Sequence, residues 1–250
     1  MSRQPPPWPT LALVFPSVDA PWEDADGQPR RHRREMAPAE LAATVDVLLG
    51  VPAAVETWSE GNARLHPFVL RVVEEPLRRL SDVGDHRYWV APQDCRQILQ
   101  RLGAPGRYAS ILVVWPAGND LPLCGWGCSV GPEPEAHGAG FSSMISDGWI
   151  RYPRLPDPEE GFVHEWLHQV EATFRSLGCD EAVVPPLHDA ETLTSCRPPS
   201  EPPYGGTYRS YHDRVETWQP WYHDYMTGQV RRPSGGCFGL TREVWLRRRS

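Results

Sequence analysis

Residues 157–178, DPEEGFVHEWLHQVEATFRSLG, form the segment of this chain whose local structure is most strongly constrained. Its apolar residues recur every three or four positions, which is the period of a helix and not the alternation of a strand; they are Val163, Leu167, Val170, Phe174 and Leu177. Asp157 suits an N-cap, Glu160 stands where a carboxylate completes a capping box, and Gly178 suits a left-handed C-cap. We therefore predict a helix over residues 158–177.

Two histidines lie four positions apart in this helix, and a glutamate directly follows the first of them. Positions four apart share one helix face, so His164 and His168 can each direct an imidazole nitrogen at one ion. Glu165 lies about 100° further round the helix, beside that ion. In this HExxH motif two neutral imidazoles bind zinc, and the carboxylate takes a proton from zinc-bound water. The alternative is a solvated helix face whose histidines bind nothing.

With this motif at His164, Glu165 and His168, the chain resembles the zincin metallopeptidases, in which the helix lies under a twisted sheet and an edge strand above it holds an extended peptide. The resemblance implies zinc-dependent cleavage of peptide bonds. It also implies an α+β, zincin-like fold: a twisted mixed sheet with the active-site helix below it and an irregular, partly helical C-terminal part. The metzincin subclass would continue H-x-x-G-x-x-H, but Glu171 and Phe174 occupy those two positions and exclude it.

A catalytic zinc needs a third protein ligand and an open position for water. His188 follows His168 by twenty residues, and residues 185–186, both proline, make a rigid turn before it. We predict His188 as the third ligand because imidazole suits zinc. Glu191 is the second choice, since gluzincin-like enzymes use a glutamate on a following helix. Asp189 is the third choice. It could equally accept a hydrogen bond from one of the metal ligands or serve as the N-cap of the next element.

Residues 204–230 are dense in tyrosine, tryptophan and histidine. Zincins often use a tyrosine or histidine to hydrogen-bond the oxyanion of the tetrahedral intermediate, and the resemblance makes Tyr225 the candidate catalytic donor here. The alternative donors are Tyr204, Tyr211, His212 and His223. An aromatic stripe at helical spacing is, however, also typical of a helix that packs into a core.

The segments before the motif helix alternate between strand and helix patterns. They predict strands at 10–19, 63–75 and 108–118, and helices at 37–50, closed by Gly50, and at 90–103. We expect a polar loop after the first strand. Accordingly, residues 1–36 form an N-terminal strand and polar loop, and residues 37–250 form a single zincin-like catalytic domain whose sheet the N-terminal strand joins.

Residues 119–138 are rich in glycine and proline, which predicts a loop. The following segment, 138–149, has small residues, adjacent glycines and the alternating pattern of a strand. Adjacent glycines in such a strand indicate a place where another backbone comes close. We therefore predict that residues 138–149 form an edge strand, and the resemblance to zincins implies that this strand binds an extended peptide by β-augmentation. An ordinary hairpin strand is the alternative.

Composition excludes several functions. The net charge of −7 makes nucleic acid an unexpected partner, and the arginine clusters at 30–35 and 245–250 are short and read as solvated. The 25 basic residues are all arginine, which excludes lysine Schiff-base chemistry. The longest early apolar run, residues 11–15, is too short for a signal peptide or a membrane span. We expect a cytoplasmic protein without membrane contact, unless a leader was trimmed or export takes another route.

The six cysteines are scattered, and CGWGC at 124–128 is weak evidence for a metal site. Buried thiols or one or two disulfides are both open. The leading hypothesis is a zinc metallopeptidase acting on a peptide or protein. The alternatives are a zinc hydrolase that cleaves a non-peptide amide in secondary metabolism, and a non-catalytic zinc-binding protein. The sequence does not indicate an oligomeric state.

Overall fold

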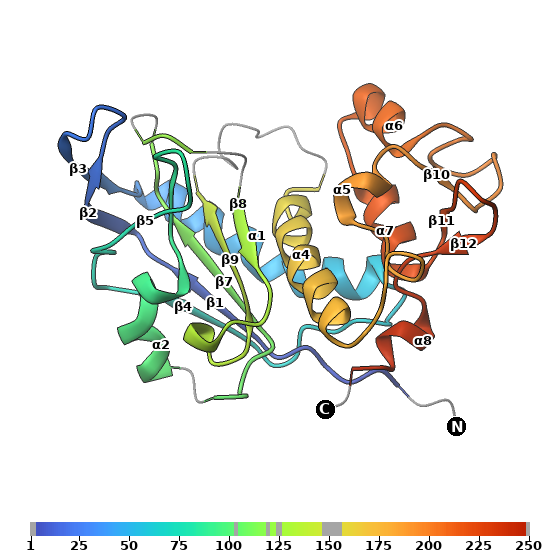
Figure 1. The fold of residues 1–250 in the computed structure, drawn as a ribbon, viewed down its shortest axis with the longest axis horizontal. Helices are drawn as coiled ribbons and strands as arrows, with labels where there is room; N and C mark the ends of the chain where they lie inside the picture. Colours follow the sequence, from blue (N-terminus) through green and yellow to red (C-terminus); the bar gives the residue numbers. More distant parts are fainter. Residues whose placement is uncertain (1–3, 103–104, 119–120, 124–126, 147–156, 249–250) are drawn as a thin grey trace.

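The computed structural model describes residues 4–102, 105–118, 121–123, 127–146 and 157–248. The chain has a mixed α+β fold built on a five-stranded sheet of order β4-β1-β7-β9-β8 (Figure 1). Strands β4, β1, β7 and β9 run parallel, and β8 runs antiparallel to β9. These strands are β1 Thr10–Val14, β4 Phe68–Val72, β7 Ser110–Trp115, β8 Gly127–Val130 and β9 Gly140–Ile145.

The central strands β1, β7 and β9 are buried along their whole length. Strands covered on both faces need side chains that tolerate burial throughout, which is why β1 and β7 have continuous apolar sequences. The predicted strands at 10–19, 63–75 and 108–118 are confirmed in β1, β4 and β7, and the N-terminal strand lies inside the sheet.

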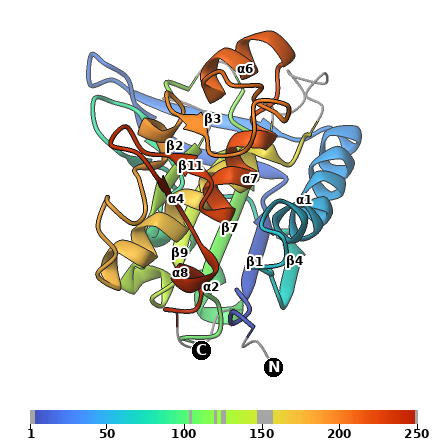
Figure 2. The same ribbon diagram turned by 90° about the vertical axis from the view of Figure 1, so that its right-hand side faces the viewer.

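Helices cover the two faces of the sheet unequally. One face packs against α1 Pro38–Trp58 and α4 Glu160–Ser176, and α7 Gln219–Thr227 packs on these two helices in turn (Figure 2). The other face packs against η1 Pro92–Cys95 and α2 Arg96–Leu102, which confirm the helix predicted at 90–103. The motif helix α4 is thus held between the sheet and the C-terminal part of the chain.

The C-terminal part is a lobe beyond α4, at the right of Figure 1. It consists of short elements, α5 Leu187–Ala190, β10 Thr194–Ser195, α6 Tyr208–Val215, α7, β11 Val230–Arg231, β12 Cys237–Phe238 and α8 Arg242–Trp245. Three further short elements precede α4: β5 Ser81–Asp82, β6 Tyr88–Trp89 and η2 Pro134–Ala136.

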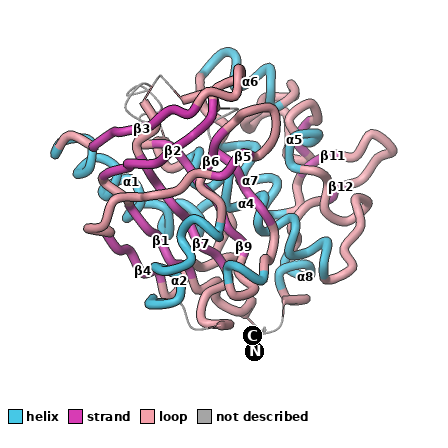
Figure 3. Tube along the Cα trace, turned by 60° about the vertical axis from the view of Figure 1, so that its left-hand side comes forward, coloured by secondary structure: helices cyan, strands magenta, loops and turns pink. Residues whose placement is uncertain are grey.

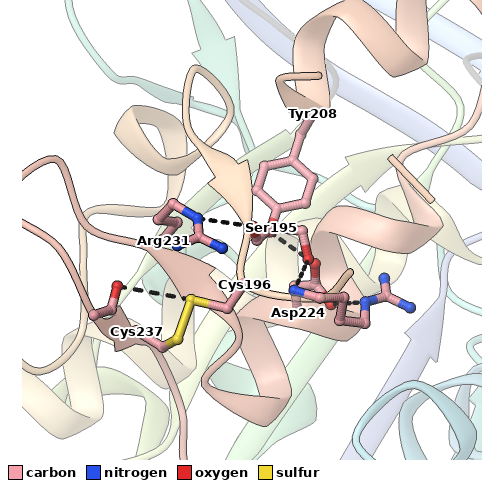
Figure 4. Close-up of a disulfide and its surroundings, with 8 residues drawn as sticks. Ser195, Cys196, Tyr208, Asp224, Arg231 and Cys237 are labelled. Atoms are coloured by element: carbon pink, nitrogen blue, oxygen red, sulfur yellow. Dashed lines mark hydrogen bonds and ion pairs between the residues drawn. A yellow bond between two sulfur atoms is a disulfide. The ribbon is translucent and has the colours of Figure 1, made fainter. Parts of the chain in front are cut away.

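A disulfide and a buried carboxylate hold this lobe together (Figure 4). Cys196 and Cys237 are bonded, which joins β10 to β12 across β11. Asp224 of α7 is fully buried and accepts a hydrogen bond of 2.8 Å from the hydroxyl of Tyr208. The Arg197 guanidinium lies 2.7 Å from the same carboxylate. These contacts fix α6 and α7 relative to each other.

Helix α1 is longer than predicted: it continues through Gly50 and Pro52 and ends at Trp58. Gly50 does not cap the helix but lies inside it, where the carboxylate of Glu159 packs against it. The prediction that the helix closes at Gly50 is wrong because Val55 and Trp58 beyond it are buried in the core, so the amphipathic helix continues to bury them. Helix α1 is long and apolar enough to cross a membrane, but core helices often meet the same criterion. One face of α1 packs in the core.

The predicted polar loop before residue 36 is instead an antiparallel ribbon of β2 Ser17–Glu23 and β3 Pro29–Glu35, at the end of the molecule away from the C-terminal lobe (Figure 3). The arginines of β3 are exposed, as predicted, but they lie on a strand and form ion pairs, so only the expectation of a loop is wrong. Asp19 pairs with both Arg31 and Arg33, and these guanidinium groups hold the pKa of its carboxyl far below its usual range.

Among the described residues β8 is the edge strand next to β9, and it lies in the stretch predicted as a loop. The predicted edge strand at 138–149 contains β9, which is paired on both sides and fully buried; residues 147–149 lie outside the described ranges. The error has a physical reason. Ser142 and Ser143 look like solvent-facing residues, but their hydroxyls form hydrogen bonds inside the protein.

Helix α4 begins at Glu160 and not at Pro158, and Gly178 has the left-handed φ of 81° predicted after its end. The predicted capping box does not form. The Glu160 carboxylate instead accepts hydrogen bonds from the hydroxyl of Thr217 and, at 2.8 Å, from the backbone N–H of Trp218. It therefore joins the start of α4 to the start of α7.

This buried carboxylate predicts a pH dependence of stability. Burial raises the pKa of Glu160 from 4.5 to about 7. A raised carboxyl pKa means that the folded state binds the proton more tightly, so the stabilisation is complete below pH 4.5 and is lost as pH rises through 7. We expect the wild type to lose about 2–3 kcal/mol more between pH 5 and 8 than Glu160→Gln does. Urea unfolding of the metal-free proteins measures this, and equal pH slopes would contradict it.

Candidate metal centre

Helix α4 brings His164 and His168 together on its face toward the C-terminal lobe. Their Nε2 atoms are 3.2 Å apart. Two nitrogens bound to one tetrahedral zinc at about 2.0–2.1 Å would lie about 3.3 Å apart, so this separation suits a shared ion. The helix is held in this rotation because Trp166, Leu167 and Val170, on its other sides, are fully buried.

His188 completes the group from a different element. It belongs to α5, and the three histidines offer ligand atoms that all lie within 4.8 Å of one another. The position of α5 is fixed from α4, because the backbone N–H of Leu187 donates to the Glu171 carboxylate at 3.0 Å. The structure therefore gathers the predicted metal ligands His164, His168 and His188.

The two other candidates for the third ligand lie differently. The Glu191 carboxylate is 2.9 Å from Nδ1 of His188 and also pairs with Arg209. Since a carboxylate only accepts, Nδ1 of His188 carries the proton, and its Nε2 lone pair is left for a metal. Glu191 thus acts through His188. Asp189 is exposed and does not line the cavity described below.

The half-buried His164 and His168 are neutral at physiological pH. Burial, more than the neighbouring imidazoles, lowers the pKa of His164 to about 3 and that of His168 to about 4. A metal binds the unprotonated imidazole, so these ligands need no deprotonation near pH 7.

Glu165 lies beside the histidines and is 7% exposed. Burial raises the pKa of its carboxyl to about 7, although a hydrogen bond from the Ser129 hydroxyl opposes the shift. Gly127 of β8 makes room for this carboxylate, because a Cβ there would overlap it. A carboxylate with a pKa near the working pH is well suited to accept and return a proton.

These groups line a cavity of about 910 Å³ between β8, α4 and the C-terminal lobe. Its lining residues include the three histidines and Glu165, the strand residues Gly127, Ser129 and Gly131, the charged residues Glu171, Arg175, Glu191 and Arg209, and His212, Trp218, Trp221 and Tyr222. The cavity therefore combines the three histidines with acidic, basic and aromatic walls.

The structure does not bring Tyr225 into this cavity. Its side chain is fully buried, and its hydroxyl donates to the carbonyl of Pro185 at 2.8 Å, where it supports the turn before His188. Of the alternative donors, Tyr204, Tyr211 and His223 also lie outside the lining. His212 does line the cavity, stacked on Trp218 with ring centroids 4.0 Å apart.

This position predicts a structural role for Tyr225. We expect Tyr225→Phe to keep its turnover number, because the lost hydroxyl does not reach the cavity, and to lower the free energy of unfolding by about 1 kcal/mol, the usual value of one buried hydrogen bond. Steady-state kinetics and urea unfolding check the two parts. A large loss of turnover with unchanged zinc content would restore the catalytic role.

Sequence reasoning missed four residues of the site. Glu171 lies seven positions after His164, on the same helix face, and this spacing could have indicated it. Tyr222, whose hydroxyl is 3.3 Å from Nδ1 of His164, was part of a predicted aromatic face without a role of its own. Gly127 and Ser129 lay in the predicted loop, and no local pattern indicates their place beside Glu165.

Comparison of the chain with known protein families, with curated proteins and with solved structures gave no match, so its site is interpreted from its own residues.

Proposed function

We propose that this protein is a zinc-dependent hydrolase that cleaves peptide bonds by means of a metal-activated water. The observation that carries the proposal is the approach of three imidazole groups to one another beside the buried carboxylate of Glu165. Two of these imidazoles are neutral because of burial, and the third is oriented by Glu191.

The donor set fits zinc. Three imidazole nitrogens are typical of catalytic zinc sites, and within the described residues the group contains three side chains, which leaves a position for water. When bound, zinc would supply Lewis acidity and a water of lowered pKa. With zinc held by the three histidines, Glu165 would accept the proton of a water at the open position and would return it to the leaving amine. His212, the alternative donor that lines the cavity, takes the role first expected of Tyr225 and hydrogen-bonds the oxyanion.

The edge strand favours a peptide over other amides. β8 pairs with β9 on one side and is the last strand of the sheet on the other. Gly127 and Ser129 of β8, and Gly131 directly after it, line the cavity. Within the described residues no strand pairs with the other edge of β8, so an extended peptide could add there by β-augmentation. This assigns to β8 the substrate-binding role first expected of residues 138–149.

A second proposal concerns the compartment in which the protein works. Disulfides persist mainly in oxidising compartments, so the Cys196–Cys237 bond favours export over the cytoplasm. Cys95 and Cys179 are buried free thiols.

Hydrolysis of a non-peptide amide stays the second candidate function, because the same water activation would serve it.

Metal analysis and a peptide-library cleavage assay test the proposal together. We expect close to one zinc per chain, lost in His164→Ala, and cleavage that follows the zinc content. Full zinc content in His164→Ala would refute the site. Stoichiometric zinc without cleavage of any peptide would refute the peptidase and favour a non-peptide substrate or a non-catalytic role.

A further inference from the structure

A chain of hydrogen bonds leads from the interior of the sheet to the Glu165 carboxylate. The side-chain amide of Gln169 donates to the carbonyl of Ile111 at 3.2 Å and to the hydroxyl of Ser142 at 2.5 Å. The Ser142 hydroxyl is 2.8 Å from that of Ser129, which lies 2.5 Å from Oε2 of Glu165. Ser142 and Gln169 are fully buried, so water does not complete this chain.

The donors and acceptors at the two ends of the chain follow from its chemistry. The Ile111 carbonyl only accepts, so the nitrogen of the Gln169 amide faces it and also donates to Ser142. At the other end an ionised carboxylate only accepts, so the single hydroxyl proton of Ser129 goes to Glu165. Between these ends, the Ser142 hydroxyl lies within reach of two acceptors, the Ser129 hydroxyl oxygen at 2.8 Å and the backbone carbonyl of Glu165 at 3.0 Å, so it is anchored against both.

The backbone of β8 reinforces this arrangement. Gly127 and Gly131 lie on the same strand face as Ser129, and a Cβ on either would overlap α4, at Glu165 and at Ala172 respectively. The strand can therefore approach the helix closely enough for one hydroxyl to reach the carboxylate. Ser129 also contacts the backbone carbonyl of Glu165 at 3.1 Å.

We propose that Ser129 is a positioning residue for the general base. Its hydroxyl holds Oε2 of Glu165, so that Oε1 is the oxygen left to face the reacting water, and the chain through Ser142 and Gln169 keeps that hydroxyl oriented. This inference rests on the proposed function in so far as Glu165 acts as a base.

Ser129→Ala tests the inference, with Ser143→Ala as the matched control. Ser143 is also a sheet serine with a buried hydrogen bond, but its partner is the indole N–H of Trp115, at 3.0 Å. We expect Ser129→Ala to lower kcat by about 10–100-fold, as loss of a group that orients a site residue typically does. KM and zinc affinity should stay unchanged. Ser143→Ala should keep kcat, and Ser129→Thr, which retains the hydroxyl, should recover most of the loss.

A double-mutant cycle separates positioning from a general packing effect. In the Glu165→Gln background, Ser129→Ala should cause little further loss of kcat, and the two changes should be non-additive in the unfolding free energy of the metal-free protein. The unfolding measurement does not depend on any substrate. Additive unfolding energies, or a Ser129→Ala enzyme with wild-type kcat, would overturn the inference, whereas an inactive wild type would overturn the proposed function alone.

Discussion

Glu165→Gln is expected to retain zinc and the fold and to lower turnover by at least about 10²–10⁴-fold, the usual contribution of a general base. Glutamine has the shape of glutamate, and its amide oxygen can still accept the Ser129 hydrogen bond. It cannot take a proton from water near neutral pH. Because Glu165 is not among the clustered metal ligands, its loss separates proton transfer from metal binding.

Zinc content per chain and kcat on the best peptide found measure the two effects. Glu171→Gln is the matched control, since it makes the same change in another carboxylate that lines the cavity, and its amide can still accept from Leu187. We expect a much smaller loss of kcat there. Wild-type turnover in Glu165→Gln, with zinc bound, would show that the proposed mechanism is wrong.

His188→Ala is expected to weaken zinc binding far more than Glu191→Ala or Asp189→Ala. Removing His188 leaves two protein ligands. Removing Glu191 takes away the carboxylate that orients His188, which typically costs about 10–100-fold in affinity. Asp189→Ala should have almost no effect, because Asp189 is exposed and lies outside the cavity lining.

Competition with a chelator ranks the three variants directly. The arrangement also has a consequence for charge: three neutral imidazoles leave the full dipositive charge on zinc, which favours a bound hydroxide near neutral pH. A glutamate ligand would reduce that charge. If Glu191→Ala loses the metal while His188→Ala keeps it, the glutamate is the ligand, and the peptidase proposal survives with a different site.

The sequence by itself determined the helices and strands whose pattern depends only on neighbouring residues. The motif helix and the strand β7 follow from hydrophobic periodicity, which needs only neighbouring residues. The four-residue spacing of His164 and His168 places them on one helix face whatever surrounds the helix. His188 could also be named, because imidazole chemistry and a double proline single it out, although nothing local shows that it approaches α4.

Only the tertiary structure decided which residues meet around that helix. β8 becomes the edge strand because β9 is paired on both sides, and a short stretch of small residues carries no periodic signal of this. Tyr222 rather than Tyr225 faces His164 because the rotation of α7 depends on its packing against α1 and α4. Likewise, Glu160 joins α7 and does not cap its own helix, since burial against Thr217 and Trp218 offers it better donors. Contacts between segments far apart in the chain depend on packing, which local spacing does not encode.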